Sequence, residues 1–141
     1  MGRKRRSVDE YQGLVDAATN ARARAYAPYS GFQVGAALLG ESGRVYAGCN
    51  VENVSYGLSS CAERNAIFRA VADGERRFTA IVVVTGAATP TPPCGACRQV
   101  LSEFAAGGDM DVVMVTTGGM RKTRRLAALL PDSFSSFERT Q

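Results

Sequence analysis

Two short apolar segments constrain the fold of this chain more than any other feature of its sequence. Residues 79–85 (TAIVVVT) and 111–116 (DVVMVT) have the length of a strand, and their apolar residues do not alternate with polar ones. Such a strand is buried on both faces, so helices must cover both faces of its sheet. Apolar spacing and terminating glycines predict helices over 8–26, 61–73 and 96–106. Strands that alternate with helices predict a layered α/β domain.

The remaining predicted elements are shorter. Residues 32–39 and 44–49 flank a turn that contains two glycines, which predicts a β-hairpin. A short strand is predicted near 120–123, and a short helix over 124–130 ends at the proline that follows. The segment before the helix at 61–73 shows no regular pattern and is predicted to be a loop.

The surplus positive charge is concentrated at the start of the chain. Four of the 17 basic residues lie at positions 3–6, and the other 13 are matched by 13 acidic residues. A body without surplus positive charge does not suit nucleic-acid binding, so no nucleic-acid partner is expected. We expect residues 1–7 to form a disordered basic tail and residues 8–141 to form a single domain.

The apolar runs do not predict a membrane protein. The longest strongly apolar run, residues 80–84, is far too short to span a bilayer, and no secretory signal is visible. A cytoplasmic location without a membrane partner is therefore expected. In that compartment, clustered cysteines more often bind a metal or take part in catalysis than form disulfides.

The absence of histidine restricts what the four cysteines can do. A Ser-His-Asp triad and a Cys-His dyad are impossible, and a transition-metal site must use cysteine, with carboxylates as the other option. Cys94 and Cys97 form a Pro-Cys-x-x-Cys motif, which alone also suits a redox site or a zinc ribbon. Cys61 lies 33 positions before Cys94, and both stand at predicted helix starts. Three thiolates there predict a zinc site with one open coordination position, as catalytic sites have.

Two neighbours of Cys61 suit a hydrolytic zinc site. Glu63 follows two residues later, close enough to exchange protons with a water at the metal without binding the metal itself. Arg64 is the next residue, and its positive charge would offset the excess negative charge of three thiolates around a divalent ion.

Several of these residues also have a plainer interpretation. Ser60 and Glu63 could form a capping box that closes the start of the helix. All four cysteines, Cys49 included, could form a closed structural zinc site without chemistry. Phe32 could be an ordinary core aromatic residue. Asn50 and Glu52 could belong to a polar loop, and Arg98 and Gln99 could lie on the exposed face of a helix.

Longer motifs give the chain a family resemblance. It resembles the small, homotetrameric cytidine deaminases of pyrimidine salvage, in the branch that holds zinc with three cysteines. The segments that carry the resemblance are YSGFQVGAA (29–37), GCNVEN (48–53), CAER (61–64), PCGACRQ (93–99) and LLPDSF (129–134). The resemblance implies a three-layer α/β/α fold with a mixed sheet of about five strands. It also implies a hydrolase that uses one Zn²⁺ per chain to convert cytidine and 2′-deoxycytidine to uridine and 2′-deoxyuridine plus ammonia.

The resemblance further implies a role for each candidate residue. Cys61, Cys94 and Cys97 would hold zinc, and Glu63 would carry a proton from the attacking water to the pyrimidine N3 atom. Phe32 would pack against the base, and the Ala62 backbone would hold the edge of the pyrimidine. Asn50 and Glu52 would form hydrogen bonds with the ribose hydroxyls. Tyr56 and Phe134 would contribute to the site of a neighbouring subunit.

Three rival functions remain open at this point. The nearest is a deaminase of the same fold that acts on another cytosine nucleoside, of the blasticidin S type. A polynucleotide editor is disfavoured by the short, charge-balanced chain, and salt-sensitive binding to single-stranded DNA would favour it. The third is a structural zinc module, which predicts that replacing Cys49 by serine loses the zinc.

Overall fold

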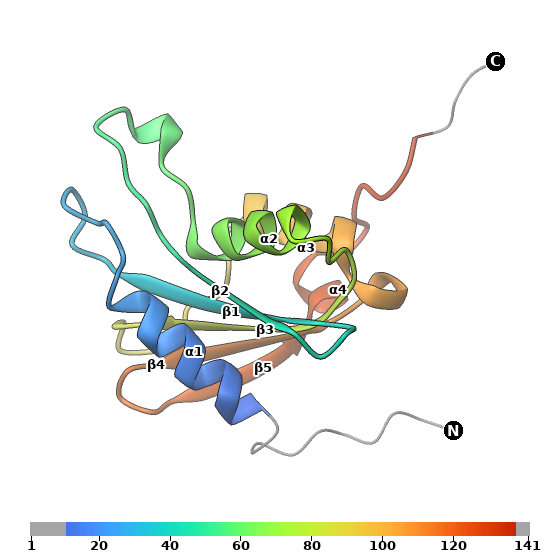
Figure 1. Cartoon of the computed structure of the whole chain (residues 1–141), viewed down its shortest axis with the longest axis horizontal. Coiled ribbons are helices and arrows are strands. Elements are labelled where there is room, and N and C mark those ends of the chain that lie inside the picture. The colour runs from blue at the N-terminus through green and yellow to red at the C-terminus, as the bar shows by residue number, and fades with distance from the viewer. Residues whose placement is uncertain (1–10, 138–141) are drawn as a thin grey trace.

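A sheet of five strands crosses the centre of the computed structural model, which describes residues 11–137 (Figure 1). The strands are β1 (Val34–Gly40), β2 (Val45–Cys49), β3 (Phe78–Thr85), β4 (Asp111–Thr116) and β5 (Arg121–Arg125). Their order across the sheet is β2-β1-β3-β4-β5. Strands β3 and β4 are parallel and the other neighbouring pairs are antiparallel, so the sheet is mixed, as expected.

Helices cover both faces of this sheet (Figure 1). Helix α1 (Gln12–Arg22) packs on one face, and α2 (Ala62–Ala72) and α3 (Gly95–Phe104) pack on the other. Three shorter helices complete the described chain: η2 (Tyr56–Leu58), η3 (Ala106–Gly108) and α4 (Leu126–Leu129). The predicted three-layer α/β/α architecture is confirmed.

Two apolar clusters form the core, one on each face of the sheet. In β3, Ile81 and Val83 belong to the cluster under α2 and α3, whereas Val82 and Val84 belong to the cluster with Leu14 of α1. Successive side chains of a strand point to opposite faces, so a strand covered on both sides must be apolar at every position. This is why the segment over 79–85 shows no alternation in the sequence.

The first helix is shorter than the sequence predicts. The helix predicted over 8–26 ends at Arg22, and residues 8–10 lie outside the described residues. Beyond the helix, the amide of Tyr26 donates to the carbonyl of Asn50 at 3.0 Å. Pairing with a distant segment therefore takes the chain out of the helix earlier than helical spacing alone indicates.

The last strand is longer than predicted and the last helix shorter. Strand β5 continues to Arg125 because Arg124 and Arg125 pair with Val112 and Asp111 of β4. Of the helix predicted over 124–130, only Leu126–Leu129 is helical.

Two further expectations concern the ends and surroundings of the chain. The predicted basic tail, residues 1–7, lies outside the described residues. Within residues 11–137, no helix combines the length and apolar character that crossing a membrane requires.

Candidate active site

Three cysteine thiols meet at the starts of two helices. Cys61 immediately precedes α2, Cys94 immediately precedes α3, and Cys97 lies in the first turn of α3. The Sγ atoms of Cys61 and Cys94 are 3.9 Å apart, those of Cys94 and Cys97 are 3.3 Å apart, and all three lie within 4.8 Å of one another.

The spacing of the three thiols fits a metal ion. Thiolates around a tetrahedral zinc, with Zn–S bonds of about 2.3 Å, lie about 3.8 Å apart, whereas disulfide sulfurs lie about 2.05 Å apart. All four cysteines are free, and Cys49 is not part of this metal-competent group among the described residues. The group can therefore offer three ligands and leave a fourth position open.

The electrostatics of the thiols also favour a cation. Hydrogen bonding with Cys97 lowers the pKa of the Cys61 thiol to about 5, aided by the Arg64 guanidinium, whose Nη2 lies 3.5 Å from Cys61 Sγ. The hydrogen bond with Cys61 raises the pKa of the Cys97 thiol, and burial raises it further. One thiolate is thus readily formed, but ionising its neighbour requires another positive charge.

Glu63 lies in the first turn of α2 and is only 5% exposed. Burial is the main cause that raises the pKa of its carboxyl, and the charge of Cys61 raises it further. Hydrogen bonds with the Glu63 amide and the Cys97 thiol lower the pKa of the carboxyl. The bond with Cys97 means that the carboxyl lies beside the thiols. A buried carboxyl with a raised pKa is suited to carry protons near neutral pH.

The capping box considered for Ser60 and Glu63 is not formed. The residue that caps α2 is Cys61, which makes no side-chain capping hydrogen bond. The Ser60 hydroxyl donates instead to Oδ1 of Asn65 at 2.7 Å. Glu63 therefore does not form a capping box with Ser60.

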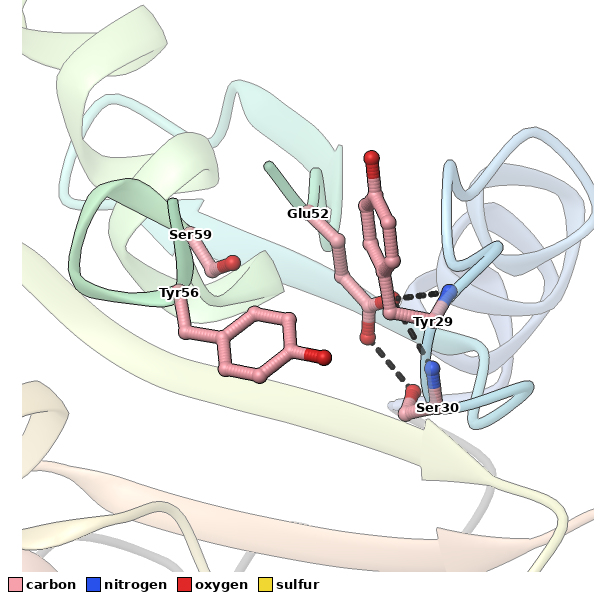
Figure 2. Close-up of a pocket in the computed structure, with 5 residues that line it drawn as sticks. All are labelled: Tyr29, Ser30, Glu52, Tyr56 and Ser59. Carbon is pink, nitrogen blue, oxygen red and sulfur yellow. Dashed lines mark hydrogen bonds between the residues drawn. The ribbon is translucent and has the colours of Figure 1, made fainter. Parts of the chain in front are cut away.

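A pocket of about 280 Å³ opens between three segments of the chain, lined by Tyr29, Ser30, Glu52, Tyr56 and Ser59 (Figure 2). The Glu52 carboxylate accepts hydrogen bonds from the Tyr29 amide at 3.0 Å, from the Ser30 amide at 3.1 Å and from the Ser30 hydroxyl. The Ser30 hydroxyl is the main cause that lowers the pKa of Glu52. The pocket thus presents an ionised carboxylate, which accepts hydrogen bonds from hydroxyl groups.

Asn50 holds the segment that carries Phe32. Its Oδ1 accepts from the Val34 amide and its Nδ2 donates to the Phe32 carbonyl, both at 2.8 Å. One amide hydrogen and one lone pair of Asn50 remain for a ligand. The Phe32 ring is 40% exposed, so it is not an ordinary core aromatic residue.

The structure brings the sequence-predicted residues together in two groups and leaves one residue apart. Cys61, Cys94, Cys97, Glu63 and Arg64 form the thiol group, and the fully buried Ala62 lies between Cys61 and Glu63 at the start of α2. Glu52 and Tyr56 line the pocket, and Phe32 and Asn50 lie on the segments beside it. Phe134 is 60% exposed and does not line that pocket.

The interpretation of Arg98 and Gln99 as an exposed helix face is wrong. Both are half-buried, and Arg98 donates to the carbonyls of Pro93 at 2.8 Å and Leu129 at 2.9 Å. Gln99 donates to the carbonyl of Phe134 at 2.9 Å. These bonds attach the segment over 129–134 to the start of α3.

Sequence reasoning also missed residues of the pocket. Tyr29, Ser30 and Ser59 line it, and Ser30 fixes the Glu52 carboxylate. The signal for the first two was their place in the YSGFQVGAA motif just before Phe32. Ser59 had no comparable signal.

Comparisons with known proteins agree with this geometry. The family model for the cytidine and deoxycytidylate deaminase zinc-binding region matches residues 8–116. A cytidine deaminase from Sporosarcina psychrophila is 48% identical over 126 residues, which cover 89% of this chain and 92% of the relative. A cytidine deaminase from Mycobacterium tuberculosis (strain ATCC 25618 / H37Rv) is 48% identical over 117 residues, which cover 83% of this chain and 84% of the relative.

Solved structures give the same result. The crystal structure of cytidine deaminase from Burkholderia pseudomallei aligns with a TM-score of 0.82 at 50% identity and covers 86% of this chain and 97% of that chain. The cytidine deaminase from Mycobacterium tuberculosis aligns with a TM-score of 0.77 at 44% identity and covers 92% and 100%, respectively. Because the family match runs through both cysteine motifs to the end of β4, the chain belongs to the cytidine and deoxycytidylate deaminase family.

Proposed function

We propose that this enzyme hydrolyses cytidine and 2′-deoxycytidine to the uracil nucleoside and ammonia. The observation that carries the proposal is the convergence of three thiols with the buried carboxyl of Glu63. The cytidine deaminases that are 48% and 50% identical to the chain support the choice of substrate. We assign the activity to one domain over residues 8–141.

Cys61, Cys94 and Cys97 hold one zinc ion per chain in this proposal. When bound, zinc supplies a Lewis acid that lowers the pKa of a water molecule at the open position. The low pKa of Cys61, about 5, supports its role as a thiolate ligand. Arg64, with Nη2 at 3.5 Å from Cys61 Sγ, returns one positive charge to a site with three anionic ligands.

Glu63 moves the protons of the reaction. It takes one from the attacking water and delivers it to N3 of the pyrimidine, which opens C4 to attack by the oxygen. It then passes the second proton of the water to the departing amino group, so that ammonia leaves and a carbonyl remains at C4. Burial supports this role because it raises the pKa of the carboxyl toward the pH at which the group can both accept and donate.

The sugar and base contacts come from the residues beside the pocket. The ionised carboxylate of Glu52 and the free positions of the Asn50 amide bind the ribose hydroxyls. Phe32 packs against the base, and the Ala62 backbone holds its edge. Free cytosine offers no hydroxyl groups to these residues, so it should be a much poorer substrate than the nucleoside.

We further propose that the enzyme is a cytoplasmic homotetramer with shared active sites, to which Tyr56 and Phe134 contribute across subunits. The two residues are 75% and 60% exposed, and large exposed aromatic side chains are typical of surfaces that another chain covers. Free thiols this close together are stable in a reducing compartment, which supports the location.

A paired measurement on the purified protein tests the function. Zinc per chain is determined by elemental analysis, and turnover is followed as the fall in ultraviolet absorbance when cytidine becomes uridine. One zinc with rapid turnover supports the proposal. One zinc with turnover of blasticidin S but not of cytidine would instead identify a deaminase for another cytosine nucleoside.

A serine variant of Cys49 separates the enzyme from a structural zinc module. Cys49→Ser should keep full zinc occupancy and full activity, since this residue lies outside the group of three thiols. Loss of zinc from that variant would mean that the fourth cysteine is a ligand and that the site is closed.

A further inference from the structure

The amide side chain of Asn65 connects the two halves of the candidate site. Nδ2 donates to the Cys49 carbonyl at 2.7 Å and to the Ser60 carbonyl at 3.4 Å, and Oδ1 accepts from the Ser60 hydroxyl at 2.7 Å. We propose that Asn65 is a positioning residue, which holds the zinc-binding and proton-transferring start of α2 in register with the ribose-binding loop. The proposal rests on the function proposed above.

The partners of Asn65 stand directly beside functional residues on both sides. Cys49 ends β2 and is followed by Asn50, and Ser60 is followed by Cys61. One side chain thus bonds to the residue before a proposed ribose ligand and to the residue before a proposed zinc ligand.

The orientation of the Asn65 amide is fixed by its neighbours. The Ser60 hydroxyl can satisfy Oδ1, whereas the two carbonyls can only accept and therefore require the Nδ2 end. An aspartate of the same size would keep the bond from Ser60 but would turn a carboxylate oxygen toward the Cys49 carbonyl. The site therefore needs an amide and not merely a polar residue of this shape.

A backbone bridge joins the same two segments but does not prevent α2 from rotating about its axis. Val51 donates to the Ser60 carbonyl at 3.0 Å and Ser60 donates to the Val51 carbonyl at 2.9 Å. These bonds lie before α2 begins, so they do not control rotation of the helix about its axis. Asn65 lies one turn inside α2, and its bond to β2 restrains that rotation. The alignment of the start of α2 with the loop that follows β2 depends on the same rotation.

Close packing at Gly48 sets the depth of α2 on the sheet. A Cβ atom at Gly48 of β2 would lie 2.5 Å from the Ala66 amide nitrogen and 2.8 Å from the Ala62 carbonyl oxygen. At this position the helix therefore rests directly on the backbone of β2. Glycine offers no side chain there to fix the rotation of the helix, and the polar link from Asn65 adds that restraint.

The test compares Asn65→Ala and Asn65→Asp with Arg69→Ala. Arg69 is the matched control because it also lies on α2 and donates to a β2 carbonyl, that of Ala47 at 3.3 Å, but on an exposed part of the helix. For each variant, zinc per chain and kcat/KM are measured with cytidine and with 2′,3′-dideoxycytidine, which lacks the 2′- and 3′-hydroxyls of the ribose.

We expect both Asn65 variants to retain zinc and to lose at least about tenfold in kcat/KM for cytidine, but less than about threefold for the dideoxynucleoside. The preference for the hydroxylated substrate falls because the loop that binds the hydroxyls no longer stands in register with the reacting centre. Arg69→Ala should match the wild type for both substrates. An unchanged preference in the Asn65 variants, or wild-type behaviour of Asn65→Asp, would overturn the proposal.

Hydrogen exchange gives a readout that does not depend on the reaction. The amides of Val51 and Ser60 should exchange faster in Asn65→Ala than in Arg69→Ala and the wild type, because the bridge they form loses its support. Equal exchange in all three proteins contradicts the positioning role. A wild-type protein that does not turn over cytidine, with the exchange difference present, contradicts the proposed function and leaves the link between the two segments in place.

Discussion

At the scale of single residues, the proposed chemistry depends most on Glu63. Replacing it with glutamine keeps the shape and the burial but removes the group that carries protons. We expect Glu63→Gln to retain zinc and melting temperature and to lower kcat by about 10²–10⁴-fold. Steady-state kinetics with cytidine and elemental analysis of the same sample measure both effects.

The matched control for this variant is Glu103→Gln, which removes an exposed carboxylate from α3. It should leave kcat unchanged. If Glu63→Gln kept more than about a tenth of the wild-type kcat, another group would have to move the protons.

Glu52 gives a residue-scale prediction about pH. Its pKa lies below the ordinary value of a glutamate, chiefly because the Ser30 hydroxyl donates to the carboxylate. A lowered pKa means that the ionised form stabilises the fold. This stabilisation is present above the ordinary pKa and is lost as the pH falls through the lowered one. The difference in melting temperature between wild type and Glu52→Gln should therefore be larger near pH 7 than near pH 4.

Calorimetry of both proteins at the two pH values measures this difference. Acid also protonates the Cys61 thiolate, but both proteins carry that thiol, so the comparison isolates the Glu52 carboxylate. A difference that stays constant or grows on acidification would show that Glu52 does not stabilise the fold as an ionised acceptor.

The sequence was informative about residues whose chemistry is local. Cys61, Cys94 and Cys97 were grouped by motif and helix starts alone, and the proximity of Arg64 to Cys61 follows from their spacing on one turn. The destination of the Ser60 hydroxyl could not be predicted. A capping box and a bond to Asn65 are both within its reach, and only the packing of α2 on β2 favours the second.

At the scale of elements, the contact between α2 and β2 depends on Gly48. A Cβ atom there would collide with the backbone of Ala62 and Ala66, which cannot yield without moving the helix. Overpacking of this kind costs about 1–3 kcal/mol. Gly48→Ala should therefore lower the melting temperature by several degrees and reduce kcat, because the displaced helix carries Glu63.

Gly13→Ala is the control for this substitution. Gly13 lies in α1, and a Cβ atom built there meets nothing within 4 Å, so alanine should stabilise the helix by about 1 kcal/mol. Thermal unfolding and kinetics of the two variants make the comparison. If Gly48→Ala unfolded at the wild-type temperature with full kcat, close packing would not set the depth of α2.

The elements themselves were predictable where their pattern is set by burial. The buried positions of β3 and β4 are apolar except at the last residue of each strand, Thr85 and Thr116, so their existence and their cover of helices on two faces follow from composition. The boundary of α1 was not predictable, because it depends on a hydrogen bond between Tyr26 and Asn50, which are far apart in the sequence. The length of β5 depends in the same way on its pairing with β4.

At the scale of the whole molecule, the end of the described chain is attached to the metal-competent group. Arg98 bonds the carbonyl of Leu129, and Gln99 bonds that of Phe134. Helical spacing alone assigned both residues to a solvent-facing surface, because nothing in one helix reveals which segment passes over it. The family resemblance included both PCGACRQ and LLPDSF, but it did not indicate that side chains of the first segment form hydrogen bonds with the backbone of the second.

This attachment has a consequence for the proposed tetramer. The Phe134 ring is exposed although its backbone is anchored, so the segment presents an aromatic side chain outward from its own subunit. If that ring completes the site of a neighbour, then Glu63 and Phe134 of one active site come from different chains. A site is then complete when one chain supplies an intact Glu63 and the neighbouring chain supplies an intact Phe134.

A complementation experiment tests this arrangement directly. Glu63→Gln and Phe134→Ala are each expected to have low activity alone. When the two are unfolded together and reassembled at equal amounts, roughly a quarter of the sites should combine an intact Glu63 from one chain with an intact Phe134 from its neighbour. Activity of the mixture should therefore exceed the mean of the two separate variants, and mixing without unfolding should restore none of it. An activity equal to that mean after reassembly would place Glu63 and Phe134 of each site on one chain, or would show that Phe134 is not part of the site at all.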